Sequence, residues 1–162
     1  MTDTATLRLP EAEALRETIA MILDGACPLQ PANATDLVTL PGTAYGALLR
    51  TDDGEAVGAI LADTATTVFL GGNLIMIPPA AQQDQYRQGR PEESVLDAMA
   101  EVVNMLRSTV NQVPGNPHVA PDPLRPLAEL AAAEPWLTSP ASRLDLAGPL
   151  PFGEGHLTLL AR

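Results

Sequence analysis

The chain contains no lysine and has a single cysteine, Cys27, among its 162 residues. One cysteine cannot form a disulfide within the chain, which fits a reducing cytosol, and we expect Cys27 to be a buried structural thiol. No apolar run approaches the roughly 20 residues that a membrane-spanning helix needs, and the N-terminus lacks the basic start and apolar core of a signal peptide. We therefore expect a cytoplasmic protein.

Positive charge is scarce along the whole sequence. The chain has nine arginines and twenty acidic side chains, which gives a formal net charge of −11. A surface of this sign repels the phosphates of nucleic acids and the headgroups of anionic membranes. We therefore expect neither nucleic acid nor a membrane as a partner.

Aromatic residues make up only 3% of the chain, whereas hydrophobic residues make up 46%. The core must therefore be built from aliphatic side chains. A chain of this length and apolar content is expected to form one domain over residues 1–162, with residues 1–9 frayed.

Several catalytic signatures are missing. The two histidines, His118 and His156, are far apart in sequence, and no cluster of cysteine and histidine has metal-ligand spacing, so we predict no metal site and no cofactor of the chain's own. No Gly-x-Ser-x-Gly motif is present, and no Gly-Lys-Ser/Thr pattern follows Gly71 and Gly72. Each histidine is expected to be a surface or hydrogen-bonded residue.

The order of predicted elements indicates an α+β domain. A helix is expected from Pro10 to Gly25, and the turn at Asp52, Asp53 and Gly54 predicts a β-hairpin. Helices that are grouped beside hairpin strands favour packing on one face of a largely antiparallel sheet. The other predicted elements are strands at Leu37 to Leu40, Ala44 to Arg50 and Glu55 to Leu61, a short helix capped by Asp63 or Thr64 and stopped at Gly71 or Gly72, a mobile polar loop over residues 80–90, an extended proline-rich segment over residues 113–126, a short helix from Leu127 to Leu137, and strands at Ser142 to Leu146 and His156 to Leu160.

One long amphipathic helix, from Pro91 to about Gln112, is predicted in the middle of the chain. Pro91 suits a first helical turn, and Glu92 and Glu93 place negative charge at the N-terminus, where the helix dipole favours it. Seven apolar residues fall within an arc of roughly 120°, which is the width of a core-facing stripe. They are Val95, Leu96, Met99, Val102, Val103, Leu106 and Val110.

The opposite side of this predicted helix carries a polar stripe of Asp97, Glu101, Asn104 and Ser108, within an arc of about 60°. Any surface helix has a solvated polar face, and that explanation stays open here. Asn104 favours a specific role, however, because asparagine is a poor helix former and an ordinary exposed position would be better filled by another residue.

The spacing Asp97-x-x-x-Glu101-x-x-Asn104, followed by Met105 and Leu106, resembles the signature of the CheC/CheX/FliY family of chemotaxis phosphatases. The single-motif CheX branch is the most similar. The equivalent positions of the first predicted helix hold Glu13, Glu17 and Ala20, with alanine in place of asparagine, so one site is expected.

The resemblance implies a CheC/CheX-like fold and dephosphorylation of a CheY-type response regulator in two-component signalling. Glu101 would anchor the partner through its active-site lysine, and Asn104 would orient the water that attacks the aspartyl phosphate. Asp97 and Ser108 would contribute to partner binding. The Mg²⁺ would be carried by the phosphorylated partner, and the CheX branch implies a homodimer formed through sheet edges.

The sequence also departs from the family pattern. Arg107 precedes Ser108, where family members often have small residues after the asparagine and its apolar neighbours. Two alternatives to a phosphatase therefore stay open. One is a CheX-like binding module that docks on a receiver domain or on itself without catalysis, and the other is a scaffold whose polar helix face is merely solvated.

Overall fold

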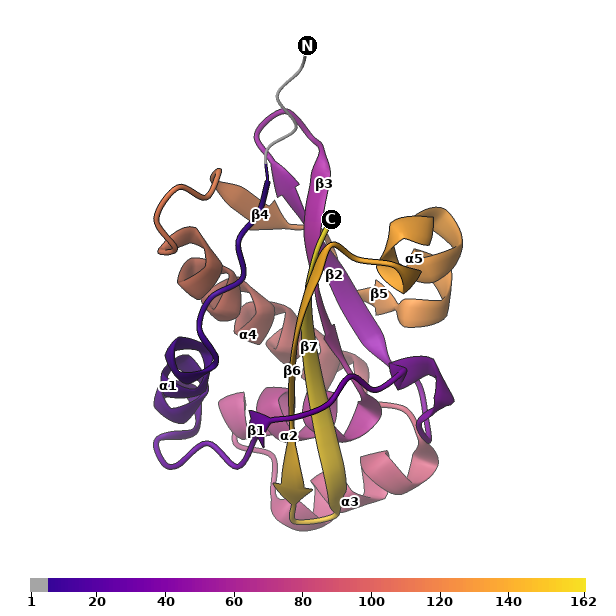
Figure 1. The fold of residues 1–162 in the computed structure, drawn as a ribbon. Helices are drawn as coiled ribbons and strands as arrows, with labels where there is room; N and C mark the ends of the chain where they lie inside the picture. The colour runs from indigo at the N-terminus through magenta and orange to yellow at the C-terminus, as the bar shows by residue number, and fades with distance from the viewer. Residues whose placement is uncertain (1–5) are drawn as a thin grey trace.

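An antiparallel sheet of seven strands forms the centre of the molecule in the computed structural model, which describes residues 6–162 (Figure 1). Its strands are β1 (Gln30–Pro31), β2 (Tyr45–Thr51), β3 (Ala56–Ala62), β4 (Val119–Pro121), β5 (Arg125–Pro126), β6 (Ser142–Leu150) and β7 (Gly153–Ala161). The spatial order is β1-β6-β7-β3-β2-β4, and β5 also pairs with β2. The longest strands, β6 and β7, form one hairpin, and β7 then pairs with the central strand β3.

Helices cover both faces of this sheet, and the long ones lie together on one face (Figure 1). The predicted α+β class with a largely antiparallel sheet is confirmed. The helices were expected on one face only, and the short helices on the second face differ from that expectation. The helices are α1 (Ala12–Leu23), α2 (Thr64–Leu74), α3 (Pro79–Gln88), α4 (Glu93–Asn111) and α5 (Leu127–Ala133), with 3₁₀ turns η1 (Leu37–Thr39) and η2 (Pro135–Thr138).

Alternation along β3 explains why both faces are covered. Its seven residues are all buried, with Ile60 and Ala62 in the cluster under α1, α2 and α4, and Ala59 and Leu61 in the cluster under α5 and η1. Successive side chains of a strand point to opposite faces, so a strand that is apolar throughout needs a cover on each side.

The hairpin predicted at Asp52, Asp53 and Gly54 joins β2 to β3, and Gly54 has the positive φ of 84° that favours glycine. The last hairpin is longer than predicted, because β6 and β7 stay paired as far as Leu150 and Gly153. Most of the residues between the two predicted strands, 147–155, are therefore part of the ladder.

Helix α2 packs directly on α4 through a glycine. Its N-terminus is capped by Asp63, whose side chain accepts a hydrogen bond from the Thr66 amide at 2.9 Å, as predicted. The predicted stop at Gly71 or Gly72 is wrong, since the helix continues to Leu74. A Cβ at Gly71 would lie 2.6 Å from the carbonyl oxygen of Val95, so this glycine permits close helix packing rather than ending the helix.

Two other predictions are wrong. Residues 37–40 do not form a strand; they form the 3₁₀ turn η1, because the side chain of Asp36 accepts a hydrogen bond from the Val38 amide. Residues 80–90 are not a mobile loop but mostly helix α3, in which Gln82 and Gln85 are buried. Gln82 donates to a backbone carbonyl and Gln85 accepts from the amide of Glu92, so these polar side chains satisfy backbone groups.

The segment before α1 is attached to the domain. Residues 1–5, within the segment expected to be frayed, lie outside the described residues. The expected fraying does not extend to Leu7, which is 2% exposed, or to Arg8. The Arg8 amide donates to the Asn116 side chain at 2.7 Å, and that side chain donates back to the Arg8 carbonyl at 2.8 Å. Within residues 6–162, no helix is long and apolar enough to cross a membrane.

Candidate functional site

Helix α4 presents the predicted apolar stripe to the core. Of the seven apolar residues, Leu96 is half-buried and the other six are fully buried. The helix begins after Pro91 and ends at Asn111, within two residues of the predicted bounds. The residues that hold it in place are Val95, Met99, Val102, Val103, Leu106 and Val110.

The polar stripe of α4 lies on the opposite, solvent side. Asp97, Glu101 and Ser108 are exposed, and Asn104 is half-buried. Among the described residues, neither Asp97 nor Glu101 forms a hydrogen bond or ion pair through its side chain. The helix spacing therefore brings all four predicted residues to one accessible face, with a carboxylate one turn before a carboxamide.

The carboxamide of Asn104 has a fixed orientation. A guanidinium nitrogen of Arg107 donates a hydrogen bond to the Asn104 side-chain oxygen. Because a guanidinium can only donate, the oxygen of the amide must face Arg107, and the amide nitrogen is left to donate elsewhere. In the sequence, Arg107 is a departure from the family pattern. No motif predicts its contact with Asn104.

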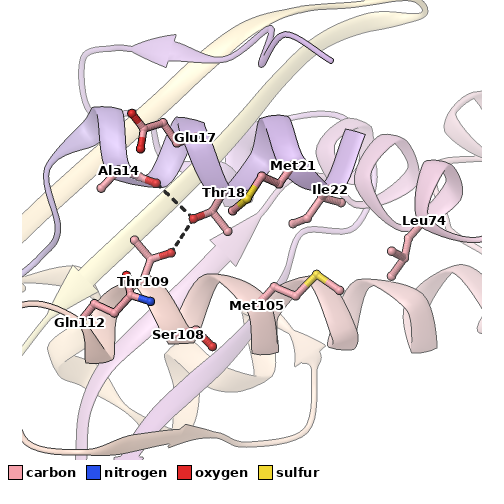
Figure 2. Close-up of a pocket in the computed structure, with 10 residues that line it drawn as sticks. All are labelled: Ala14, Glu17, Thr18, Met21, Ile22, Leu74, Met105, Ser108, Thr109 and Gln112. Atoms are coloured by element: carbon pink, nitrogen blue, oxygen red, sulfur yellow. Dashed lines mark hydrogen bonds between the residues drawn. The ribbon is translucent and has the colours of Figure 1, made fainter. Parts of the chain in front are cut away.

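A groove runs beside this stripe, between α1 and α4 (Figure 2). Its volume is about 610 Å³. Among its lining residues, the hydroxyl oxygens of Thr18 and Thr109 lie 2.7 Å apart in a hydrogen bond that joins the two helices. Ser108 belongs both to the polar stripe and to the wall of the groove. The lining residues are Ala14, Glu17, Thr18, Met21, Ile22, Leu74, Met105, Ser108, Thr109 and Gln112.

Helix α1 does not repeat the arrangement of α4. Glu13 forms an ion pair with Arg16 at 2.6 Å, and Glu17 is exposed at the wall of the groove. Ala20 stands where α4 has its carboxamide. Of the two helices, therefore, only α4 combines a carboxylate with an amide on its exposed face.

The histidines belong to hydrogen-bonded pairs away from α4. The half-buried His156 has its Nδ1 3.0 Å from a carboxylate oxygen of the buried Asp63, and Glu154 lies 3.6 Å from its other ring nitrogen. Asp63 also accepts from the His156 amide, so the pair connects β7 to the start of α2. His118 lies 3.1 Å from Asp52 on the surface. Over residues 6–162, no group of three or more His, Cys, Asp or Glu could hold a metal ion.

Sequence comparison identifies no relative: no protein-family model and no curated protein matches the chain. Comparison with solved structures does find similar folds. FliM in the FliG–FliM complex from H. pylori is 9% identical with a TM-score of 0.63, over 93% of this chain and 85% of that one. CheX in the CheX–CheY–BeF₃–Mg²⁺ complex from Borrelia burgdorferi is 15% identical with a TM-score of 0.56, over 95% and 98%. CheX from Vibrio vulnificus is 11% identical with a TM-score of 0.55, covering 94% of each chain.

These similarities confirm the predicted CheC/CheX-like fold. The match extends over nearly the whole chain in each case, and it includes CheX, FliM and FliY structures. At identities of this size the match establishes the fold and does not separate the CheX branch from the FliM branch. The function must therefore be argued from the exposed face of α4.

Proposed function

We propose that the chain is a CheX-like phosphatase that hydrolyses the aspartyl phosphate of a CheY-type receiver domain. The observation that carries the proposal is the placement of Glu101 and Asn104 one turn apart on the exposed face of a rigid helix, in the fold of proteins that include CheX. The proposal implies a single cytoplasmic domain that acts in chemotaxis or related two-component signalling.

Asn104 is suited to orient the attacking water. Phosphoryl transfer depends mainly on in-line placement of the nucleophile and on neutralisation of charge, and a receiver domain brings its own Mg²⁺ and lysine. The free amide nitrogen of Asn104 can donate to the phosphoryl group. Its oxygen has a second lone pair besides the one that Arg107 uses, so it can still accept from water. A neutral amide also adds no negative charge that would repel the phosphate.

Glu101 is suited to anchor the partner. Its carboxylate is exposed and forms no ion pair among the described residues, so it is available to a lysine of the receiver. Asp97 lies one turn earlier and Ser108 one turn beyond Asn104 on the same face. These two residues would extend the contact on either side of the reacting groups. The Mg²⁺ in this scheme belongs to the partner, and a solved complex of CheX with CheY also contains BeF₃ and Mg²⁺.

A second candidate function is a docking module without catalysis. FliM structures, solved in complex with FliG and with SpeE, match this chain with TM-scores of 0.63 and 0.62, compared with 0.56 for CheX. The hydrogen bond from Arg107 to Asn104 also occupies part of the amide that catalysis would use. Under this alternative, the stripe on α4 binds a receiver domain or another protein and leaves its phosphate intact.

A phosphate-release assay separates the two functions. The full chain is added to a receiver domain that has been phosphorylated with a small-molecule phosphodonor, and the loss of aspartyl phosphate is followed with time. We expect acceleration by the wild type, and a loss of about 10²-fold or more in rate for Asn104→Ala with unchanged folding. The matched control is Asn33→Ala. It makes the same change at an exposed asparagine outside α4 and should leave the rate unchanged.

Three outcomes are informative. Unchanged dephosphorylation by the Asn104→Ala variant would remove this residue from the mechanism. Binding to the phosphorylated receiver without acceleration would favour the docking module. Neither binding nor acceleration with a panel of receiver domains would leave the polar stripe as a solvated helix face.

We also infer a homodimer through the edges of the sheet. Strand β1 pairs with only two residues of the nine-residue β6, so much of that edge of the hairpin is not covered by a neighbouring strand within residues 6–162. Size-exclusion chromatography with light scattering measures the mass of the protein in solution. A monomeric mass across the micromolar range would contradict the dimer without affecting the phosphatase proposal.

A further inference from the structure

Exposed apolar side chains gather at one end of the groove between α1 and α4. Met21 is 76% exposed and Met105 is 40% exposed, and both line the groove opposite one another (Figure 2). Leu74, at the end of α2, closes this end, and the exposed Ile75 and Met76 follow it directly. Four of the five large hydrophobic residues that are exposed within residues 6–162 therefore belong to this end of the groove or to the segment beside it.

The groove has the length of a short helix. Its α1 wall runs from Ala14 to Ile22, which corresponds to about 12 Å or roughly two helical turns. The end near Met21 and Met105 is apolar, and the other end is lined by the hydroxyl groups of Thr18, Ser108 and Thr109. Methionine is flexible and polarisable, so it adapts to the shape of a docked apolar side chain. A trough of this kind suits an amphipathic helix laid along it.

The charge at the walls of the groove is negative. None of the ten lining residues is basic, and Glu17 is one of them. On α4, Glu101 lies outside the lining, one turn before Met105, and makes no ion pair among the described residues. The nearest arginine on α1, Arg16, is occupied by the carbonyl of Leu29 and by Glu13. A helix that enters the groove would therefore meet the carboxylate of Glu17 on α1, with the carboxylate of Glu101 one turn before Met105 on α4.

We propose that this groove binds an amphipathic helix of a partner protein, with an apolar stripe on the methionines and with Lys or Arg at its flanks. A second copy of this chain is a poorer occupant, because its own α1 carries the like-charged Glu13 and Glu17. An anionic membrane is repelled by the net charge of −11. This inference goes beyond the phosphatase proposal, since binding in the groove requires neither Asn104 nor a phosphate.

Two synthetic peptides test the proposal. Both have 18 residues and the same leucine stripe, and they carry either Lys or Glu at the flanking positions. The full chain is labelled with ¹³C at its methionine methyl groups, and spectra are recorded as each peptide is added. We expect the Lys peptide to shift the signals of Met21 and Met105. Met99, which is 1% exposed in the core, is the internal reference and should not move. The Glu peptide should cause no shift.

Substitutions establish where the peptide binds. Met21→Glu and Met105→Glu place a charge on the apolar end at exposed positions, so both variants should fold and should bind the Lys peptide at least tenfold more weakly. The matched control is Val38→Glu, which makes the same change at an exposed apolar residue of η1, outside the groove. It should bind like the wild type.

Three results would overturn the proposal. The first is failure of the Lys peptide to bind at millimolar concentration. The second is equal weakening, or no weakening, by all three glutamate substitutions, which would indicate general attraction between a cationic peptide and an acidic protein. The third is binding of the Glu peptide with similar affinity. Because the readout is binding alone, an inactive phosphatase would leave this test intact.

Discussion

Arg107 donates a hydrogen bond to the carboxamide oxygen of Asn104, one turn earlier on α4. This bond fixes the orientation of the Asn104 amide. The oxygen faces the guanidinium, and the nitrogen is left free to donate to another group. In the proposed mechanism, therefore, Arg107 is a positioning residue for Asn104 and makes no contact with the phosphate of its own.

Removing this bond should lower turnover without loss of partner binding. We expect Arg107→Met, which keeps the length of the apolar stem, to reduce the dephosphorylation rate about fivefold, as a lost hydrogen bond of about 1 kcal/mol would do. The receiver concentration at half-maximal rate should stay unchanged. Steady-state kinetics separate the two quantities, and a thermal melt checks folding. A variant that loses rate and affinity together would indicate a docking role for Arg107 instead.

The close packing of α2 on α4 depends on Gly71. We expect Gly71→Ala to lower the free energy of unfolding by about 1–3 kcal/mol, because the new Cβ would lie 2.6 Å from the Val95 carbonyl oxygen and 3.2 Å from the Met99 amide. Urea denaturation measures the change. Gly25→Ala is the control, since no atom lies closer than 3.9 Å to its new Cβ, and its effect should stay within about 0.5 kcal/mol. Equal stabilities of the two variants would show that the helices separate at little cost.

Asp63 connects three parts of the fold, and its removal should be costly. Its buried carboxylate accepts from the Thr66 amide, the His156 amide and the His156 ring. We expect Asp63→Ala to lower the free energy of unfolding by about 2–4 kcal/mol, from the lost helix cap and the unpaired groups left behind. Asp36→Ala removes a comparable cap from the exposed η1 and should cost no more than about 1 kcal/mol. Chemical denaturation of both variants would reveal whether burial makes this difference.

Burial raises the pKa of the Cys27 thiol, and the hydrogen bond from the thiol to the Leu29 carbonyl only partly opposes this effect. The native thiol is therefore protonated at neutral pH, and we expect it to react with a disulfide reagent at least a hundredfold more slowly than in the unfolded chain. The raised pKa stabilises the fold fully below the unfolded thiol pKa of about 8.5, and this stabilisation is lost as the pH rises through the folded pKa.

Two measurements test this prediction for Cys27. The reaction rate with the reagent is recorded in buffer and in urea, and the free energy of unfolding is recorded at pH 7 and at pH 10. The Cys27→Ser variant gives the background rate and should lose less stability over that pH range. A native thiol that reacts as fast as the unfolded one would mean that the loop around Cys27 opens readily.

The long helix and its polar stripe could be predicted from the sequence because the apolar residues of α4 recur with the helical period along all 19 residues. The hairpin at Gly54 and the cap at Asp63 could be predicted for a similar reason, since each depends on neighbouring residues alone. These local rules are enough to place Glu101 and Asn104 on the solvent face.

Features that depend on distant residues could not be predicted in this way. Helix α3 has a polar composition that suggested a loop, and its Tyr86 packs on Phe152 in the distant turn between β6 and β7. The function of Gly71 is visible only once α4 lies against α2. The groove likewise exists because α1 and α4, about 90 residues apart, come together at Thr18 and Thr109.

The hydroxyl pair of Thr18 and Thr109 joins the two helices that form the walls of that groove (Figure 2). Moving α1 away from α4 would break this hydrogen bond. The bond therefore favours the observed spacing of the two helices before a partner helix binds. Much of the backbone entropy lost on docking would then come from the incoming helix, and stiffening that helix with a side-chain staple should tighten the complex.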